Sequence, residues 1–150
     1  MIIIYIFADS HKHFSEAISE YLKRLWKTVE IRELKPVKKW TSEQIITAET
    51  SIIKDKLIWE KWYKFILSPA GKQFSTGDFW KLIETQKNQG QKIIFVIWGA
   101  NGLNYQDLKN IVDMELSLGS MILPHSLAFT ILLEQIYRCS EIEKWSGYHK

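Results

Sequence analysis

Short apolar runs alternate with segments of helical periodicity along this chain, and that alternation constrains its fold more than any other feature. The first run, Ile2 to Phe7, is β-branched and aromatic and ends at Asp9-Ser10, as strands commonly do. The segment 68–72 contains Pro and Gly and is predicted to be a turn. Further strands are predicted over 29–34, 63–67, 92–97 and 114–118, and helices over 14–25, 42–56, 75–90, 105–112 and 124–141.

This alternation favours an α/β fold, in which a mostly parallel sheet is covered by helices on both faces. The 150 residues suit a single domain, 1–150, with one hydrophobic core. The formal net charge of +3 permits a nucleic-acid partner without requiring one. Composition therefore limits the fold class more than it limits the function.

The single cysteine and the first apolar run exclude several other classes. Cys139 is the only cysteine, so we expect no internal disulfide and no multi-cysteine metal site, and we interpret it as a small core residue. The run from Met1 to Ala8 is too short to cross a membrane and follows no basic segment. We therefore expect a cytoplasmic protein without a membrane or metal partner.

Three glycine-containing loops follow predicted strands, over 67–72, 98–104 and 118–124. In open parallel sheets, ligands bind beyond the carboxyl ends of the strands. Glycine in each loop would let the backbone approach a ligand closely. Glycine and proline also make ordinary turns, so the residues alone leave both interpretations open.

The C-terminal third carries four short motifs in a fixed order. Leu116-Ser117 is followed by Leu123-Pro124-His125, then by Glu134-Gln135 with Tyr137-Arg138, and last by Tyr148-His149-Lys150. This order resembles the C-terminal signature of the large-subunit rRNA pseudouridine N3-methyltransferases, which belong to the knotted SPOUT class. The resemblance extends to 17–25, to Gly71-Lys72 followed by Ser75, and to 95–97.

The resemblance implies a SPOUT methyltransferase fold with a deep C-terminal trefoil knot. It implies S-adenosyl-L-methionine as cofactor, bent in the knot and held largely by backbone groups. It also implies large-subunit rRNA or the ribosome as substrate, and a homodimer whose active site uses residues from both chains. The cofactor-binding residues that it implies are Leu67, Trp98, Gly99, Leu118, Gly119, Ser120, Met121, Ile122 and Leu123.

N3 of pseudouridine is a weakly acidic imide nitrogen, so a base that takes its proton would assist methylation. His125, Tyr148 and His149 are the candidate catalytic residues. His125, at the start of a predicted helix, is equally readable as a structural or capping residue. The family places Tyr148 and His149 on the substrate side, and which residue acts as the base stays open.

The chain departs from the family pattern at three positions near the expected pocket. Trp98 stands where the family has the first glycine of a pair, Ser68 replaces a usual acidic residue, and Phe129 replaces a common arginine. These departures motivate the alternative of a catalytically silent knotted dimer that binds RNA or ribosomes. A dinucleotide-binding enzyme is a weaker alternative, because 98–102 lacks the G-x-G-x-x-G spacing.

Two surface features suggest partners. The last predicted helix is apolar on most sides, which indicates burial against the sheet and against a second subunit. Aromatic and basic residues are mixed in two segments, a pattern that can bind phosphate and stack bases but is also common on solvated faces. The two segments comprise Trp59, Lys61, Trp62, Tyr63 and Lys64, and Lys35, Lys38, Lys39 and Trp40.

Overall fold

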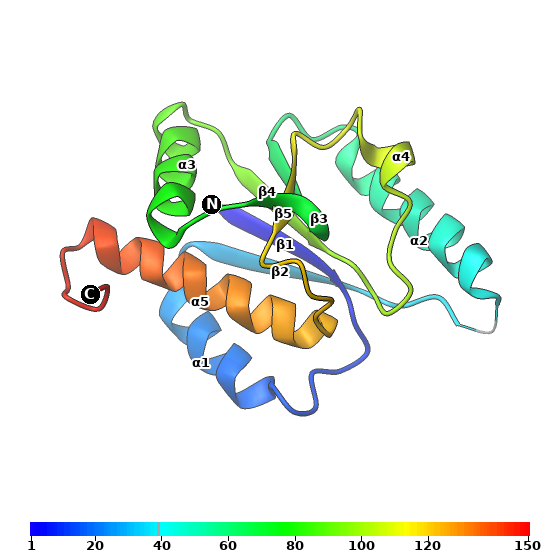
Figure 1. Ribbon diagram of the computed structural model, residues 1–150, viewed down its shortest axis with the longest axis horizontal. Coiled ribbons are helices and arrows are strands. Elements are labelled where there is room, and N and C mark those ends of the chain that lie inside the picture. The colour runs from blue at the N-terminus through cyan, green and yellow to red at the C-terminus, as the bar shows by residue number, and fades with distance from the viewer. Residues whose placement is uncertain (39) are drawn as a thin grey trace.

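The computed structural model describes residues 1–38 and 40–150, which form a five-stranded sheet flanked by helices (Figure 1). All the strand pairs are parallel, and the strand order is β2-β1-β4-β3-β5. The α/β class and the parallel sheet are therefore confirmed. The strands are β1 (Ile2–Phe7), β2 (Val29–Leu34), β3 (Tyr63–Gln73), β4 (Ile93–Ile97) and β5 (Met114–Ser117).

Two of the helices begin where a capping residue predicts. The side chain of Thr41 accepts the Gln44 N–H while Gln44 returns the contact to the Thr41 N–H, which completes a capping box at the start of α2. Ser75 accepts the Asp78 N–H at the start of α3. The helices are α1 (Ser15–Leu25), α2 (Ser42–Leu57), α3 (Thr76–Asn88), α4 (Tyr105–Leu108) and α5 (His125–Glu143).

The two faces of the sheet carry separate parts of the core. Successive strand residues point to opposite faces, so Ile2, Ile4 and Ile6 of β1 pack with α1, α3 and α5. Ile3, Tyr5 and Phe7 pack on the other side with α2 and α4. Figure 1 shows α1, α3 and α5 apart from α2 and α4. Helices thus cover both faces, and Cys139 is buried in the first cluster as expected.

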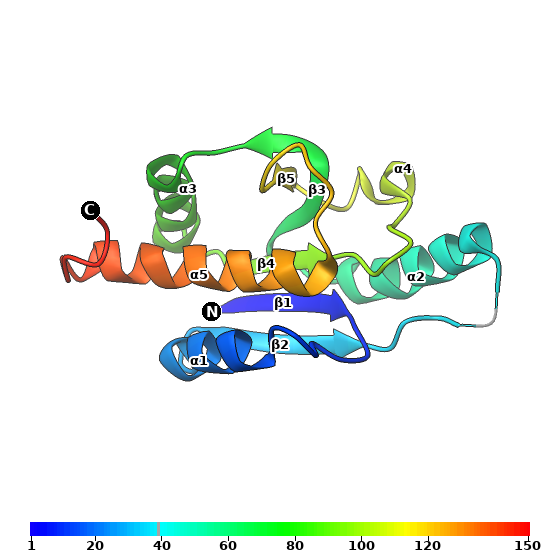
Figure 2. The same ribbon diagram turned by 60° about the horizontal axis from the view of Figure 1, so that its bottom comes forward.

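Strand β3 runs past the predicted turn, so the interpretation of 68–72 as a turn is wrong. Leu67 and Lys72 both pair with Leu116 of β5, and the intervening residues bulge away from regular pairing. Figure 2 shows β3 curving over β5. Gly71 is what permits this path, because a Cβ there would lie 2.6 Å from the Glu115 carbonyl carbon and oxygen.

Other differences from the predicted elements are small. Helix α4 ends at Leu108 and not near residue 112, because successive turns then direct Val112 into the core and bring Asp113 to the backbone N–H of Lys64. The trefoil knot stays a prediction. Lys39, named above with a basic cluster, lies outside the described residues. Within 1–38 and 40–150, no helix combines the length and the apolar character that crossing a membrane requires.

Candidate cofactor and substrate site

A cavity of about 560 Å³ lies at the carboxyl ends of β3, β4 and β5, where all three glycine-containing loops meet. A volume of this size is in the range of roughly 300–1,000 Å³ typical of small-molecule pockets. Its lining is predominantly apolar side chains together with loop backbone. The lining residues are Leu67, Ser68 and Pro69, the segments 97–102, 118–119 and 121–124, and His125 and Ala128 of α5.

Ser117 ties two of these loops together. Its hydroxyl contacts the Pro69 carbonyl at 3.2 Å and the Gly119 carbonyl at 2.8 Å, and it accepts the Gly119 N–H at 3.1 Å. Gly119 has a φ of +148°, a backbone conformation that residues with a side chain rarely adopt. The wall of the cavity between β3 and β5 is therefore fixed by a buried hydroxyl and by one glycine.

Trp98 borders the cavity but does not fill it. Its indole packs with the cluster on the α2 and α4 side of the sheet. Gly102 covers the ring at a φ of +79°, and a Cβ there would approach Trp98 Cε3 to 3.0 Å. The cavity remains open beside this packed side chain, so the bulky residue at a family glycine position leaves room for a ligand.

Glu49 of α2 lies directly behind the Trp98-Gly99 turn. It is 1% exposed; Oε1 accepts the Val37 N–H at 2.9 Å, whereas Oε2 has no hydrogen-bond partner among the described residues. Oε2 would lie 3.1 Å from a Cβ on Gly99. Burial raises the pKa of Glu49, and the Val37 N–H only partly opposes that rise.

The pKa of Glu49 is higher in the folded protein than in the unfolded chain. The free energy of unfolding therefore falls as the pH rises from the unfolded-state pKa through the folded-state pKa. We expect Glu49→Gln to remove this dependence while keeping an oxygen for Val37. The unfolding free energy of the variant relative to the natural chain should rise between pH 5 and pH 8. Chemical denaturation at both pH values measures it, and a constant difference would contradict the prediction.

His125 is the first residue of α5 and lines the cavity. Burial, and then the charge of His11, lowers the pKa of His125, with a smaller opposing effect from Asp9. The two imidazole centroids are 6.5 Å apart. A lowered pKa keeps His125 neutral at pH 7, which is the form able to accept a proton.

His11 is a neighbour of the site that the sequence did not reveal. Its Nδ1 is 2.9 Å from the Ser126 hydroxyl, and its Nε2 is 3.4 Å from Glu33 Oε1. Its ring also lies 5.3 Å from that of Phe129, which is 1% exposed. The family's arginine position is therefore occupied by a buried ring that packs on His11. His11 could have been found from the sequence because it follows the carboxyl end of β1, which lies at the same edge of the parallel sheet as the cavity.

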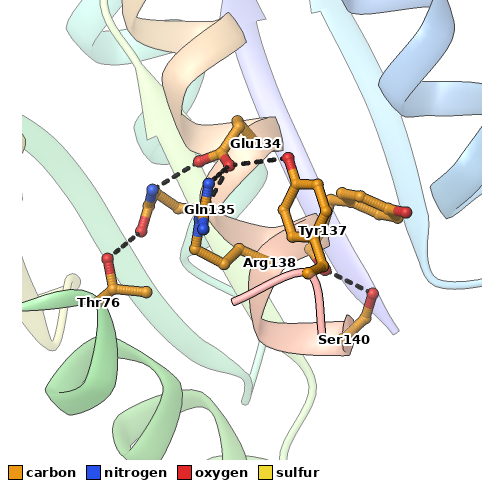
Figure 3. Close-up of polar contacts among 7 residues, drawn as sticks. Thr76, Glu134, Gln135, Tyr137, Arg138 and Ser140 are labelled. Carbon is orange, nitrogen blue, oxygen red and sulfur yellow. Dashed lines mark hydrogen bonds and ion pairs between the residues drawn. The ribbon is translucent and has the colours of Figure 1, made fainter. Parts of the chain in front are cut away.

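Tyr148 and His149 follow the carboxyl end of α5, and Tyr148 folds back on that helix away from the cavity. The Tyr148 hydroxyl donates to Glu134 at 3.2 Å, and its ring meets the Tyr137 ring edge-on at 5.1 Å. Arg138 lies over the Tyr148 ring. Figure 3 shows Arg138 paired with Glu134, which Gln135 connects to Thr76 of α3. Burial and then the Glu134 charge raise the pKa of Tyr148, so its phenol stays protonated here.

The structure thus brings together most, but not all, of the predicted site. Eight of the nine implied cofactor residues and His125 line one cavity. Ser120 belongs to the loop 118–124 but does not line the cavity. Tyr148 and His149 do not line the cavity of their own chain. Sequence reasoning missed Glu49, a carboxylate among apolar helix positions, and it missed His11. Among residues 1–38 and 40–150, no three His, Cys, Asp or Glu side chains are grouped to hold a metal ion.

Comparison with known protein families identifies the family to which this chain belongs. The model of the family described as predicted SPOUT methyltransferases matches residues 1–149. The chain belongs to the SPOUT methyltransferase family. This SPOUT methyltransferase is 36% identical to the Ribosomal RNA large subunit methyltransferase H of Bacillus cytotoxicus, with 99% of this chain and 98% of the relative covered.

Two further relatives of this SPOUT methyltransferase carry the same name. The protein of Fusobacterium nucleatum is 35% identical over 99% of this chain and 97% of its own length. The protein of Ruminiclostridium cellulolyticum is 35% identical over 93% of this chain and 92% of its own. The similarity therefore covers both the loops that form the cavity and the tail at the end of α5.

Proposed function

We propose that this protein methylates N3 of a pseudouridine in large-subunit rRNA, using S-adenosyl-L-methionine.

 The observation that carries this proposal is the apolar cavity of about 560 Å³ formed by the three glycine-containing loops, in a chain that matches the family over residues 1–149. Its relatives are named for methylation of large-subunit rRNA. With this substrate, we also propose a cytoplasmic location for the protein.

The residues of the cavity fit the cofactor. Leu67, Leu118 and Leu123 offer apolar surface to an adenine ring, and the turns at Gly99 and Gly119 let the backbone approach a ligand without Cβ atoms in the way. Trp98 is packed beside the cavity and not across it. When bound, S-adenosylmethionine supplies an electrophilic methyl group.

The chain's own residues contribute position and proton transfer. His125 faces the cavity in its neutral form, so it is the residue of one subunit best placed to accept the N3 proton. Tyr148 keeps its proton where it lies, so it acts as a donor and not as a base. We propose that Tyr148 and His149 meet the substrate of a second subunit in a homodimer.

Calorimetric titration with S-adenosylmethionine tests the cofactor first. We expect micromolar binding, because the cavity is preformed and Trp98 does not occupy it. Trp98→Gly is the matched variant and should change affinity little. Absence of binding in the natural chain, with recovery in Trp98→Gly, would show that the indole blocks the pocket.

Methyl transfer is then tested on ribosomes and on free large-subunit rRNA, with the modified nucleoside identified by mass spectrometry. We expect N3-methylpseudouridine in ribosomes and little in free rRNA, because a net charge of +3 provides weak binding to naked RNA. Cofactor binding without transfer to either substrate would favour the silent RNA-binding dimer.

A further inference from the structure

The edge of the sheet opposite the cavity carries exposed tryptophans and lysines that the proposed reaction does not use. Trp26 is 71% exposed and Trp59 is 86% exposed, although large apolar side chains are normally covered. Lys27, Lys61 and Lys92 are also exposed, and Trp62 is half-buried. We call these six residues the Trp–Lys edge.

Backbone pairing at the amino ends of the strands brings together the segments that carry these residues. The Ile2 N–H donates to the Thr28 carbonyl, the Ile93 N–H to the Met1 carbonyl, and the Tyr63 N–H to the Lys92 carbonyl. Neighbouring parallel strands are about 4.8 Å apart, so the strand ends from β2 to β3 span about 14 Å. That span equals two or three nucleotides of an extended strand.

Each end of the Trp–Lys edge combines a cation with an indole. Lys27 Nζ lies 4.9 Å from the centre of the Trp26 ring, and Lys92 Nζ lies 4.5 Å from that of Trp62. A lysine held on a ring is placed to meet a phosphate while a base stacks on neighbouring aromatic surface. The arrangement therefore has both parts of a single-strand binding surface.

The net charge of the Trp–Lys edge favours a nucleic-acid partner over a protein partner. Glu60 is the acidic residue within the α2–β3 turn, while Glu143, on the nearby end of α5, is engaged by Lys87 at 2.8 Å. Lys27, Lys61 and Lys92 thus leave the edge with a net positive charge, which complements a phosphate backbone. Figure 2 shows that the chain's amino end, the end of α1 and the C-terminal tail lie toward the same end of the molecule.

We infer that the Trp–Lys edge binds a single-stranded segment of RNA, by stacking on its indoles and by pairing its lysines with phosphates. This inference rests on the proposed rRNA substrate and adds a second contact remote from the cavity of the same subunit. The edge would hold RNA next to the tail that carries Tyr148 and His149. Its contribution is to substrate binding and not to cofactor binding.

The test is fluorescence anisotropy of a labelled 12-nucleotide RNA of mixed sequence, titrated with the full chain at low salt and without S-adenosylmethionine. We expect Trp26→Ala with Trp59→Ala to weaken binding about fivefold or more, the loss expected for one stacked base. Trp26→Phe with Trp59→Phe keeps a stacking ring and should restore most of the affinity. These tryptophans are exposed, so folding should be unaffected.

A charge-reversal pair tests the phosphate contacts separately. Lys27→Glu with Lys92→Glu should weaken binding and reduce the slope of log affinity against log salt by about 1.4, or 0.7 for each lost phosphate contact. Lys81→Glu is the control, because Lys81 is 70% exposed on α3 and is not one of the six residues of the edge. It should change affinity by less than about twofold, since exposed charges more than a Debye length from the RNA are largely screened.

Three results would overturn the inference. The first is no RNA binding by the natural chain, and the second is unchanged binding in both the tryptophan-to-alanine pair and the lysine-to-glutamate pair. The third is a change of oligomeric state in light scattering without a change in RNA binding, which would make the edge an interface between copies. Methylation is read independently on ribosomes. RNA binding without methyl transfer would refute the proposed function alone, whereas normal methylation by both edge variants would refute only the edge.

Discussion

Gly71→Ala is expected to destabilise the protein by about 3 kcal/mol or more, at the upper end of the effect of overpacking a core. The new Cβ would lie 2.6 Å from the Glu115 carbonyl carbon and oxygen and 2.8 Å from the Leu116 carbonyl carbon. These are backbone atoms of β5, so no side-chain rotation relieves the contact. The strand pairing between Lys72 and Leu116 would have to open, and the cavity wall beyond Leu116 would move with it.

Gly77→Ala is the matched control for this change. Gly77 lies in α3, and the nearest atom to a Cβ there is Ser75 Oγ at 4.0 Å. Alanine in a helix should stabilise it by up to about 1 kcal/mol. Thermal unfolding measures both variants, and we expect Gly71→Ala to lower the melting temperature by about 10 °C. Equal melting temperatures would mean that β3 does not wrap β5 this closely.

Local pattern was sufficient to predict the sheet and most helix boundaries. Apolar runs such as 93–97, together with capping residues such as Thr41 and Ser75, act over a few neighbouring residues, so the sequence displays them directly. The segment 68–72 was predicted incorrectly because its Ser, Pro and Gly residues have the composition of a turn. Its strand conformation depends on β5, about 45 residues later, and no local pattern encodes that pairing.

The candidate site divides in the same way. The three glycine-containing loops follow strands, so their meeting at one edge was predictable from a parallel sheet. Glu49 and His11 were missed because each reaches the site by folding of a segment that carries no recognisable motif. Glu49 occupies an apolar position of α2, and His11 meets Ser126 across 115 positions of sequence. The effect of Trp98 depended on side-chain packing, which only the structure resolves.

The positions of His125 and Tyr148 bear on the proposed dimer. His125 begins α5, and Glu134, which accepts the Tyr148 hydroxyl, is nine residues further along, or about 14 Å at 1.5 Å per residue. Tyr148 folds back on the helix and is held there by Glu134, Tyr137 and Arg138, outside the cavity that His125 lines. We therefore propose that, if His125 and His149 act on one substrate, a second subunit supplies one of them. A monomer in light scattering at micromolar concentration would contradict this arrangement.

Mixed dimers are expected to recover activity that the parent variants lack. His125→Ala and His149→Ala should each lower turnover about a hundredfold or more, as loss of an acid–base or positioning group does. His149→Ala should leave S-adenosylmethionine affinity nearly unchanged, because the cavity of its own chain is intact. A dimer of one His125→Ala chain and one His149→Ala chain contains one site with both histidines if the two come from different subunits. It should therefore turn over at about half the natural rate per dimer.

The reciprocal mixed dimer decides between shared and separate sites. A natural chain paired with a His125→Ala, His149→Ala chain has one defect in each site if the sites are shared, and should be nearly inactive. Sites contained within single chains would reverse both results, giving half activity here and none in the first mixed dimer. Purification through two different affinity tags yields each mixed dimer, and methylation of ribosomes measures its turnover. Both mixed dimers carry the same two substitutions and differ only in how these are distributed between the chains. The two results together therefore show whether the tail that carries His149 acts at the cavity of its own chain or at that of the other subunit.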